Sequence, residues 1–226
     1  VKHTISRDIE SIQKFKQSKY VYSEVDNIYE LVKEKLNTGE NVLFISLPCK
    51  VAGLRGFLNK DYDNLTTIDI VCHGTPSYKM LYDHIKFVDK KGLGTKLRFR
   101  DDNQMLFGLS NKSKTVYRKY GREDTYMVAF LEGLDYRESC YHCQFAKPER
   151  ISDITISDFW GLGSEIPFEH EYSGAISALL INTQKGMDFF EKSKHRFFYE
   201  ERLVEEAIKG NAQLYSPTKH HLKRNL

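Results

Sequence analysis

The sequence predicts an α/β or α+β protein with a mixed, partly parallel sheet, flanking helices and a small antiparallel hairpin. Three observations predict this class. In residues 26–89, short apolar, β-branched runs alternate with segments of helical periodicity, which is typical of parallel βαβ units. Residues 96–120 contain alternating, β-rich triplets joined by a turn signal, as in antiparallel hairpins. Beyond residue 150, strand and helix patterns alternate again.

The first part of the chain gives the clearest alternation of strand and helix. Apolar side chains recur at helical spacing before Gly39, and Pro48 lies where a helix can begin. In order, we expect a helix over 26–37, a strand over 41–46, a helix from Pro48, a strand over 66–71, and a helix over 77–89 capped by Ser77.

The second part changes pattern and contains a pair of closely spaced cysteines. In order, we expect a hairpin or meander over 96–120 with a turn at Asp101, Asp102 and Asn103, a helix over 125–132 ending at Gly133, a loop knuckle at Cys140 and Cys143, a strand over 154–157, a turn over 160–163, a strongly buried strand over 175–182, and helices over 183–196 and 203–209. The basic residues 220–224 are expected to form a short solvated tail.

The composition of the 226 residues is that of a globular protein. Apolar residues make up 40% and aromatic residues 13%, and 34 Lys and Arg stand against 31 Asp and Glu. The near balance of charge gives no sign of nucleic-acid binding, and no apolar run approaches a membrane span. Without a signal-peptide pattern we expect a cytoplasmic protein. We further expect one domain over 1–226, forming the C-terminal part of a longer protein, since the chain opens on Val1 in charged, helix-like material.

Four cysteines occur at positions that a parallel sheet would bring together. Cys49 and Cys72 each follow a predicted buried strand, and neighbouring parallel strands end at the same edge of a sheet, where ligands bind in open α/β folds. Cys140 and Cys143 have the C-x-x-C spacing of metal knuckles. A shared four-thiolate site suits tetrahedral zinc or an iron–sulfur cluster, whereas buried cysteines without a ligand remain an alternative.

Polar and aromatic residues surround these positions. The tract at Lys19, Tyr20 and Ser23 combines a cation, a phenol and a hydroxyl before a helix, a set able to hold a phosphate and stack a flat ring, or simply to cap the helix. The strand-to-helix turn at Pro48 presents backbone N–H groups. Asp158 and Trp160 share a side at the exit of a strand, where Trp160 serves either as a platform or as core. His142 is expected to be exposed, and His73 is a loop histidine beside Cys72.

Three ordered motifs carry a resemblance that spans nearly the whole chain. Residues 46–55, 69–77 and 137–161 resemble the Pro-Cys, Cys-His-Gly and cysteine-knuckle segments of one family. This is the beta-subunit family of the coenzyme F420 (deazaflavin) hydrogenases and dehydrogenases, here similar to its bacterial branch. Members usually begin with a ferredoxin-like segment and a flavin-binding stretch, which this sequence does not contain.

The resemblance implies an iron–sulfur flavoprotein oxidoreductase that passes electrons between a 4Fe-4S cluster and FAD to a two-electron acceptor, a deazaflavin or another small molecule. The resemblance implies no particular catalytic residue. It implies a partner protein or an N-terminal ferredoxin-like domain for electron transfer. The implied cluster ligands are Cys49, Cys72, Cys140 and Cys143. The candidate flavin contacts are Lys19, Tyr20, Ser23, Pro48, His73, Asp158 and Trp160.

A second hypothesis explains the cysteines without redox chemistry. Four thiolates suit zinc as well as iron, so the chain is also interpretable as a structural zinc-binding interaction module, associated with polysaccharide biosynthesis in some relatives. The bound metal distinguishes the two hypotheses.

Overall fold

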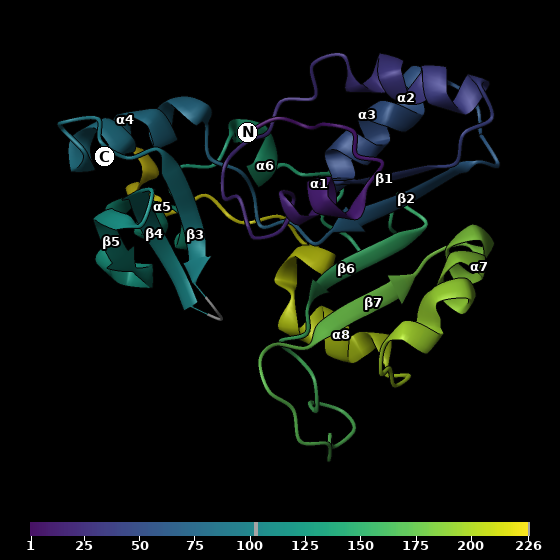
Figure 1. Ribbon diagram of the computed structural model, residues 1–226. Coiled ribbons are helices and arrows are strands. Elements are labelled where there is room, and N and C mark those ends of the chain that lie inside the picture. Colours follow the sequence, from purple (N-terminus) through teal and green to yellow (C-terminus); the bar gives the residue numbers. More distant parts are fainter. Residues whose placement is uncertain (102–103, 226) are drawn as a thin grey trace. The chain divides into compact units, whose positions relative to one another are not determined.

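The structure, a computed structural model, describes residues 1–101 and 104–225, which form two compact units (Figure 1). The first unit contains Val1–Asp26, Gly74–His142 and the residues from Thr218 onward. The second contains Asn27–His73 and Cys143–Pro217. The organisation as one domain stays a prediction. Within the described ranges no helix is long and apolar enough to cross a lipid bilayer.

A four-stranded mixed sheet forms the centre of the second unit (Figure 1). Its order is β1-β2-β6-β7, with β1, β2 and β6 parallel and β7 antiparallel to β6. The strands are β1 (Val42–Ser46), β2 (Leu65–Ile70), β6 (Ile154–Asp158) and β7 (Ser177–Ile181). The βαβ connection from β1 to β2 and the mixed, partly parallel sheet confirm the predicted fold class.

Helices cover this sheet because each has one apolar side. The helices of the unit are α2 (Ile28–Asn37), α3 (Pro48–Leu58), α7 (Gln184–Ser193) and α8 (Val204–Gly210), with short 3-10 helices η2 (Lys194–Arg196) and η3 (Ala212–Leu214). Side chains of α2 and α3 bury Phe44 and Leu65, which belong to the same apolar cluster at β1 and β2. The helix α7 approaches the sheet so closely that a Cβ on Gly186 would collide with the Asp153 carbonyl oxygen.

The first unit contains an antiparallel three-stranded sheet, as the alternating pattern of 96–120 predicts. The strands are β3 (Lys96–Asp101), β4 (Gln104–Asn111) and β5 (Lys114–Tyr120). The helices are α1 (Ile9–Gln13), α4 (Tyr78–Val88), α5 (Thr125–Leu131) and α6 (Glu138–Tyr141), with 3-10 helices η1 (Gly121–Glu123) and η4 (Leu222–Asn225). The predicted cap Ser77 accepts a hydrogen bond from the Met80 amide, and of the predicted turn only Asp101 lies within the described residues.

Three expectations differ from the structure. The strand predicted as strongly buried, 175–182, is the edge strand β7, and Leu179 is 41% exposed. Its apolar sequence resembles that of a central strand because one of its faces packs against α8 and η3. The knuckle is not wholly a loop, since Cys140 lies in the short helix α6. The tail is not simply solvated, because Arg224 packs over the ring of Tyr141.

A buried carboxylate organises the loop that follows β6. Glu206 has no exposed surface, and its Oε1 accepts hydrogen bonds from the backbone amides of Gly163, Glu165 and Ile166. Arg202 donates to both carboxylate oxygens. The hydrogen bond from Arg202 outweighs burial and lowers the pKa of Glu206 to about 2. The charge on Glu206 therefore stabilises the turn that follows Trp160.

The lowered pKa of Glu206 predicts that the fold loses part of its stability in acid. A carboxyl group whose pKa falls from 4.5 in the unfolded chain to about 2 in the folded one stabilises the fold fully above pH 4.5 and progressively less as the pH falls towards 2. We expect Glu206→Gln to lower the melting temperature at pH 7, and the difference from the unsubstituted chain to shrink below pH 4.5. Thermal unfolding followed at several pH values measures it. A difference that is the same at every pH would contradict the prediction.

Candidate functional site

Two of the four cysteines emerge at the carboxyl edge of the parallel sheet in the second unit. Ser46 of β1 is the register partner of Asp69 in β2, and Cys49 and Cys72 each come three residues after one member of this pair. Since parallel strands end at the same edge, the prediction that both cysteines leave the sheet there is confirmed. Cys49 is exposed and Cys72 is partly exposed.

The helix α3 gives Cys49 a particular electrostatic setting. Pro48 is the first helical residue and Cys49 the second, while Leu47 at the N-cap supplies no side-chain cap. The positive end of the helix dipole favours negative charge in this first turn, which suits a thiolate. The predicted turn at Pro48 is thus a helix N-terminus with its first turn at the sheet edge.

A buried arginine ties the segment after Cys143 to the same edge. Arg150 Nη2 lies 2.7 Å from Asp69 Oδ1, and the two side chains are 2% and 0% exposed. Arg150 Nη1 donates to the Phe145 carbonyl oxygen at 2.9 Å, two residues after Cys143. Ser152 donates to the other oxygen of Asp69 at 2.7 Å. One ion pair therefore joins the chain beyond Cys143 to the strand end that precedes Cys72.

A second set of contacts, in the first unit, joins the residues after Cys72 to those before Cys140. The Arg137 amide donates to the Thr75 carbonyl oxygen at 3.0 Å, and Pro76 forms a bridge with Tyr136. Thr75 Oγ1 lies 3.9 Å from Cys140 Sγ. This pairing holds the helix that carries Cys140 next to the segment that continues from Cys72.

Gly74 makes that pairing possible. Its φ is +132°, a conformation that side chains rarely adopt, and a Cβ there would collide with the ring of Tyr136. Tyr136 is buried, and its hydroxyl donates to the Phe130 carbonyl oxygen, so the ring cannot easily yield. Glycine at this position therefore permits the close approach of two chain segments.

Three further candidates lie in the second unit at the carboxyl ends of its strands. Asp158 is the last residue of β6, whose carboxyl end lies at the edge where β2 ends. Trp160 follows in a turn and is 63% exposed, so it does not fill the core. Burial lowers the pKa of His73, and the charge of Asp158 acts in the opposite direction. The indole of Trp160 is thus accessible for stacking.

The candidates of the first unit are engaged with the protein itself. The Lys19 ammonium donates to three carbonyl oxygens, those of residues 15, 16 and 17, and burial lowers its pKa. The ring of Tyr20 stacks on that of Phe130 with the centroids 4.5 Å apart, and the Tyr20 hydroxyl accepts a hydrogen bond from Arg100. Ser23 is half-buried. Lys19 therefore closes the turn after α1 and does not cap the helix that follows the tract, because the N-cap of α2 is Asn27.

Sequence analysis did not single out Arg150, Gly74 or Asp135. Both carboxylate oxygens of Asp135 are buried and have no hydrogen-bond partner in the described chain, and burial raises its pKa to about 7. A lone aspartate in a loop normally faces solvent, so its residue type gave no signal. Arg150 and Gly74 act through partners distant in the sequence, which local patterns do not identify.

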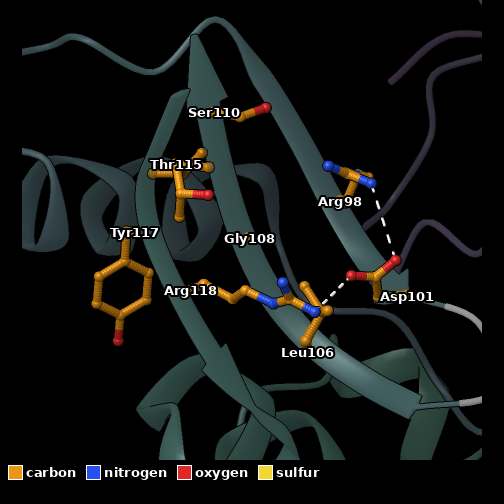
Figure 2. A pocket seen from close by; sticks show the side chains of 9 residues that line it. Arg98, Asp101, Leu106, Gly108, Ser110, Thr115, Tyr117 and Arg118 are labelled. Atoms are coloured by element: carbon orange, nitrogen blue, oxygen red, sulfur yellow. Dashed lines mark hydrogen bonds and ion pairs between the residues drawn. The ribbon is translucent and has the colours of Figure 1, made fainter. Parts of the chain in front are cut away.

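A pocket in the first unit lies on the antiparallel sheet and is lined by none of the predicted site residues (Figure 2). Asp101 forms ion pairs with Arg118 at 2.5 Å and with Arg98 at 3.9 Å. Asp101 thus engages both arginines of this pocket, and none of the residues predicted for the site lines it.

Comparison with known proteins gives one family. Residues 39–207 match the C-terminal family of the beta subunit of Coenzyme F420 hydrogenase/dehydrogenase. The chain is similar to a solved structure from a study of xenon derivatization of the F420-reducing NiFe hydrogenase complex from Methanosarcina barkeri, with a TM-score of 0.55 and 16% identity over 94% of this chain and 72% of that one. At this identity the likeness concerns the fold. Curated protein sequences give no match.

The ion pair between Arg150 and Asp69 predicts a large cost on removing one partner. Arg150→Met leaves the buried Asp69 carboxylate without its counter-ion, which typically costs about 3–5 kcal/mol. Arg122→Met is the matched control, because the Arg122–Glu132 ion pair is largely exposed and worth less than about 1 kcal/mol. Urea unfolding of the two variants measures the difference. Equal losses would mean that Arg150 does not anchor this edge.

The close packing around Gly74 predicts that a single added methyl group at this position destabilises the fold. Gly74→Ala places a Cβ against the ring of Tyr136 and forces a disfavoured backbone conformation, which alone costs about 1–3 kcal/mol. Gly56→Ala is the control, because no atom lies within 4 Å of that Cβ in α3 and alanine favours helix. We expect Gly74→Ala to destabilise the chain and Gly56→Ala to leave it unchanged or more stable. Similar unfolding midpoints would refute the close contact.

Proposed function

The chain belongs to the family of coenzyme F420 hydrogenase/dehydrogenase beta subunits, in its C-terminal part, and from that premise we propose that it is an iron–sulfur flavoprotein. The family is one of oxidoreductase subunits. In our proposal the chain holds a 4Fe-4S cluster beside FAD and serves electron transfer to a two-electron acceptor, a deazaflavin or another small molecule.

The arrangement of the cysteines is the observation that carries the proposal. Cys49 and Cys72 each lie three residues after one member of the register pair Ser46 and Asp69, at the carboxyl edge of the parallel strands. Cys143 lies two residues before the carbonyl that Arg150 ties to that edge. Cys140 contacts Thr75, three residues after Cys72. All four are cysteines, whose thiolates are the donor type that iron–sulfur clusters require.

The surroundings of the thiols suit a group bound through thiolates. The N-terminus of α3 favours negative charge at Cys49. The Thr75 hydroxyl is within reach of Cys140 Sγ, and hydrogen bonds to sulfur are one means by which proteins tune a cluster. When bound, the cluster supplies single electrons and the flavin converts pairs of them into hydride. The buried Arg150–Asp69 pair supports the ligand-bearing segments of the second unit.

The proposed flavin contacts have different support. The exposed indole of Trp160 offers a flat apolar surface for a ring system, and the turn at Pro48 offers the positive end of a helix. His73 and Asp158 interact electrostatically and are able to hold or pass a proton. Lys19, Tyr20 and Ser23 remain proposed contacts, although Lys19 would have to exchange its carbonyl partners for a phosphate.

An electron-transfer partner follows from the same proposal. A site that exchanges single electrons with a cluster needs a donor or acceptor protein, either a separate protein or a ferredoxin-like domain. The similar solved structure belongs to a hydrogenase complex. The alternative remains a zinc-binding interaction module built from the same four thiols, which metal analysis separates from the redox proposal.

Replacement of Cys143 by Ser tests the cluster. Cys143→Ser removes one thiolate, so we expect the anaerobically purified variant to lose iron and sulfide and the broad absorbance of the cluster. The unsubstituted chain should contain about four irons. Iron, sulfide, zinc and flavin are measured on the same samples. Ser139→Ala, an exposed neighbour in α6, is the control and should keep the full iron content.

Two outcomes would overturn the proposal. Unchanged iron in Cys143→Ser would remove this residue from the ligand set. Zinc without iron, sulfide or flavin in the unsubstituted protein, with about one zinc fewer per chain in Cys143→Ser, would support the interaction module and end the redox assignment.

A further inference from the structure

A second group of side chains of metal-ligating types lies in the first unit, around the helix α6 that also contains Cys140. Donor atoms of Glu138, His142 and His220 all lie within 4.8 Å of one another. His220 Nε2 is 2.9 Å from Glu138 Oε1, and His142 Nε2 is 3.7 Å from the same oxygen. We propose that these three residues bind a divalent transition-metal ion of the zinc type.

The helix α6 presents two of the three ligands. Glu138 is its first residue and His142 its C-cap, so the two are four residues apart and project from the same side of the turn. His220 comes from the C-terminal segment, 82 residues after Glu138. A metal at this position would therefore join that segment to the helix that contains Cys140.

The ring of His220 is positioned by packing. It stacks on Tyr141 with the ring centroids 4.0 Å apart, and Tyr141 is buried. The Tyr141 hydroxyl donates to the Gly133 carbonyl oxygen and accepts from Arg224, which fixes the aromatic platform. His220 therefore approaches Glu138 on a rigid support rather than from a free tail.

The carboxylate of Glu138 is also oriented. Arg224 Nη2 donates to Glu138 Oε2 at 3.4 Å, and Arg224 Nη1 donates to the Leu134 carbonyl oxygen at 3.0 Å. Oε2 is thereby occupied, and Oε1 is the oxygen close to both histidines. Hydrogen-bond partners of a metal-ligating side chain commonly fix its orientation.

The two separations from Glu138 Oε1 are close to those of tetrahedral coordination. With zinc bonds of about 2.0–2.2 Å to nitrogen and oxygen, tetrahedral ligands lie about 3.4 Å apart. The observed separations of 2.9 and 3.7 Å from Glu138 Oε1 fall on either side of this value. Two imidazoles and one carboxylate favour zinc or a neighbouring transition metal over magnesium or calcium, which prefer oxygen ligands. The exposure of all three side chains leaves a fourth position for water.

Metal binding requires that Nε2 of His220 carry no proton. In the structure His220 Nε2 lies within hydrogen-bond distance of Glu138 Oε1. The metal takes the lone pair of Nε2 while Nδ1 carries the remaining ring proton: an imidazolium releases its Nε2 proton to solvent, and a neutral ring changes tautomer without net proton release. No oxidant or reductant takes part.

Zinc chloride added to the purified chain tests the proposal. The readout is the ¹⁵N NMR signal of the histidine rings, because a ring nitrogen that binds zinc gives its lone pair to the metal, whereas zinc bound only by cysteines leaves the ring nitrogens uncoordinated. We expect the ring nitrogens of His142 and His220 to shift, with saturation at one zinc beyond any bound by the thiols. His220→Asn and Glu138→Gln should each weaken this binding at least about tenfold.

His170→Asn is the matched control. His170 forms an exposed pair with Glu200 at 3.2 Å, the same donor types without a third ligand in the described chain. We expect this variant to bind zinc as the unsubstituted chain does. Unshifted ring signals of His142 and His220, or equal affinity in His220→Asn and the unsubstituted chain, would overturn the proposal. Since iron and sulfide content report the cysteine site separately, either assignment can fail without the other.

Discussion

The buried ion pair between Arg150 and Asp69 is the interaction on which the candidate site depends. A buried charge without a partner is strongly unfavourable, so the two residues must remain together for the second unit to fold. Asp69 lies in β2, three residues before Cys72, while Arg150 also holds the backbone that follows Cys143. The pair is thus both a structural requirement and the link between two cysteine-bearing segments of the chain.

A second buried carboxylate supports the same sheet. Asp153 accepts hydrogen bonds from the amide and hydroxyl of Thr67 and from Thr183. Burial alone would raise its pKa, but these hydrogen bonds and the nearby Arg55 outweigh it and lower the pKa. The polar interactions fix the register of β2 against β6 more specifically than apolar contacts, because a shifted strand would leave buried carboxylates unpaired. These interactions would give the proposed cofactor site at the carboxyl edge a rigid foundation.

The two metal assignments differ in how the fold supports them. The cysteines rely on strand ends, a helix N-terminus and buried ion pairs, as expected for a centre that must keep one geometry. The proposed Glu138, His142 and His220 site relies on an aromatic platform and one arginine at the surface. The helix α6 takes part in both, because Cys140 lies within it and His142 ends it. Metal at the histidines would therefore restrict the C-terminal segment next to the knuckle.

The amino-acid sequence by itself determined the alternation of strand and helix, the position of Cys49 and Cys72 after buried strands, and the family motifs. These features repeat over a few residues, and local periodicity reports them directly. The tertiary structure decided that β7 is an edge strand, that Arg150 pairs with Asp69 across 81 residues, and that His220 reaches Glu138. Such partners depend on the order of strands and the packing of distant segments. A charged or polar group strongly favours one partner only when it is buried, and these groups become buried only when the chain folds.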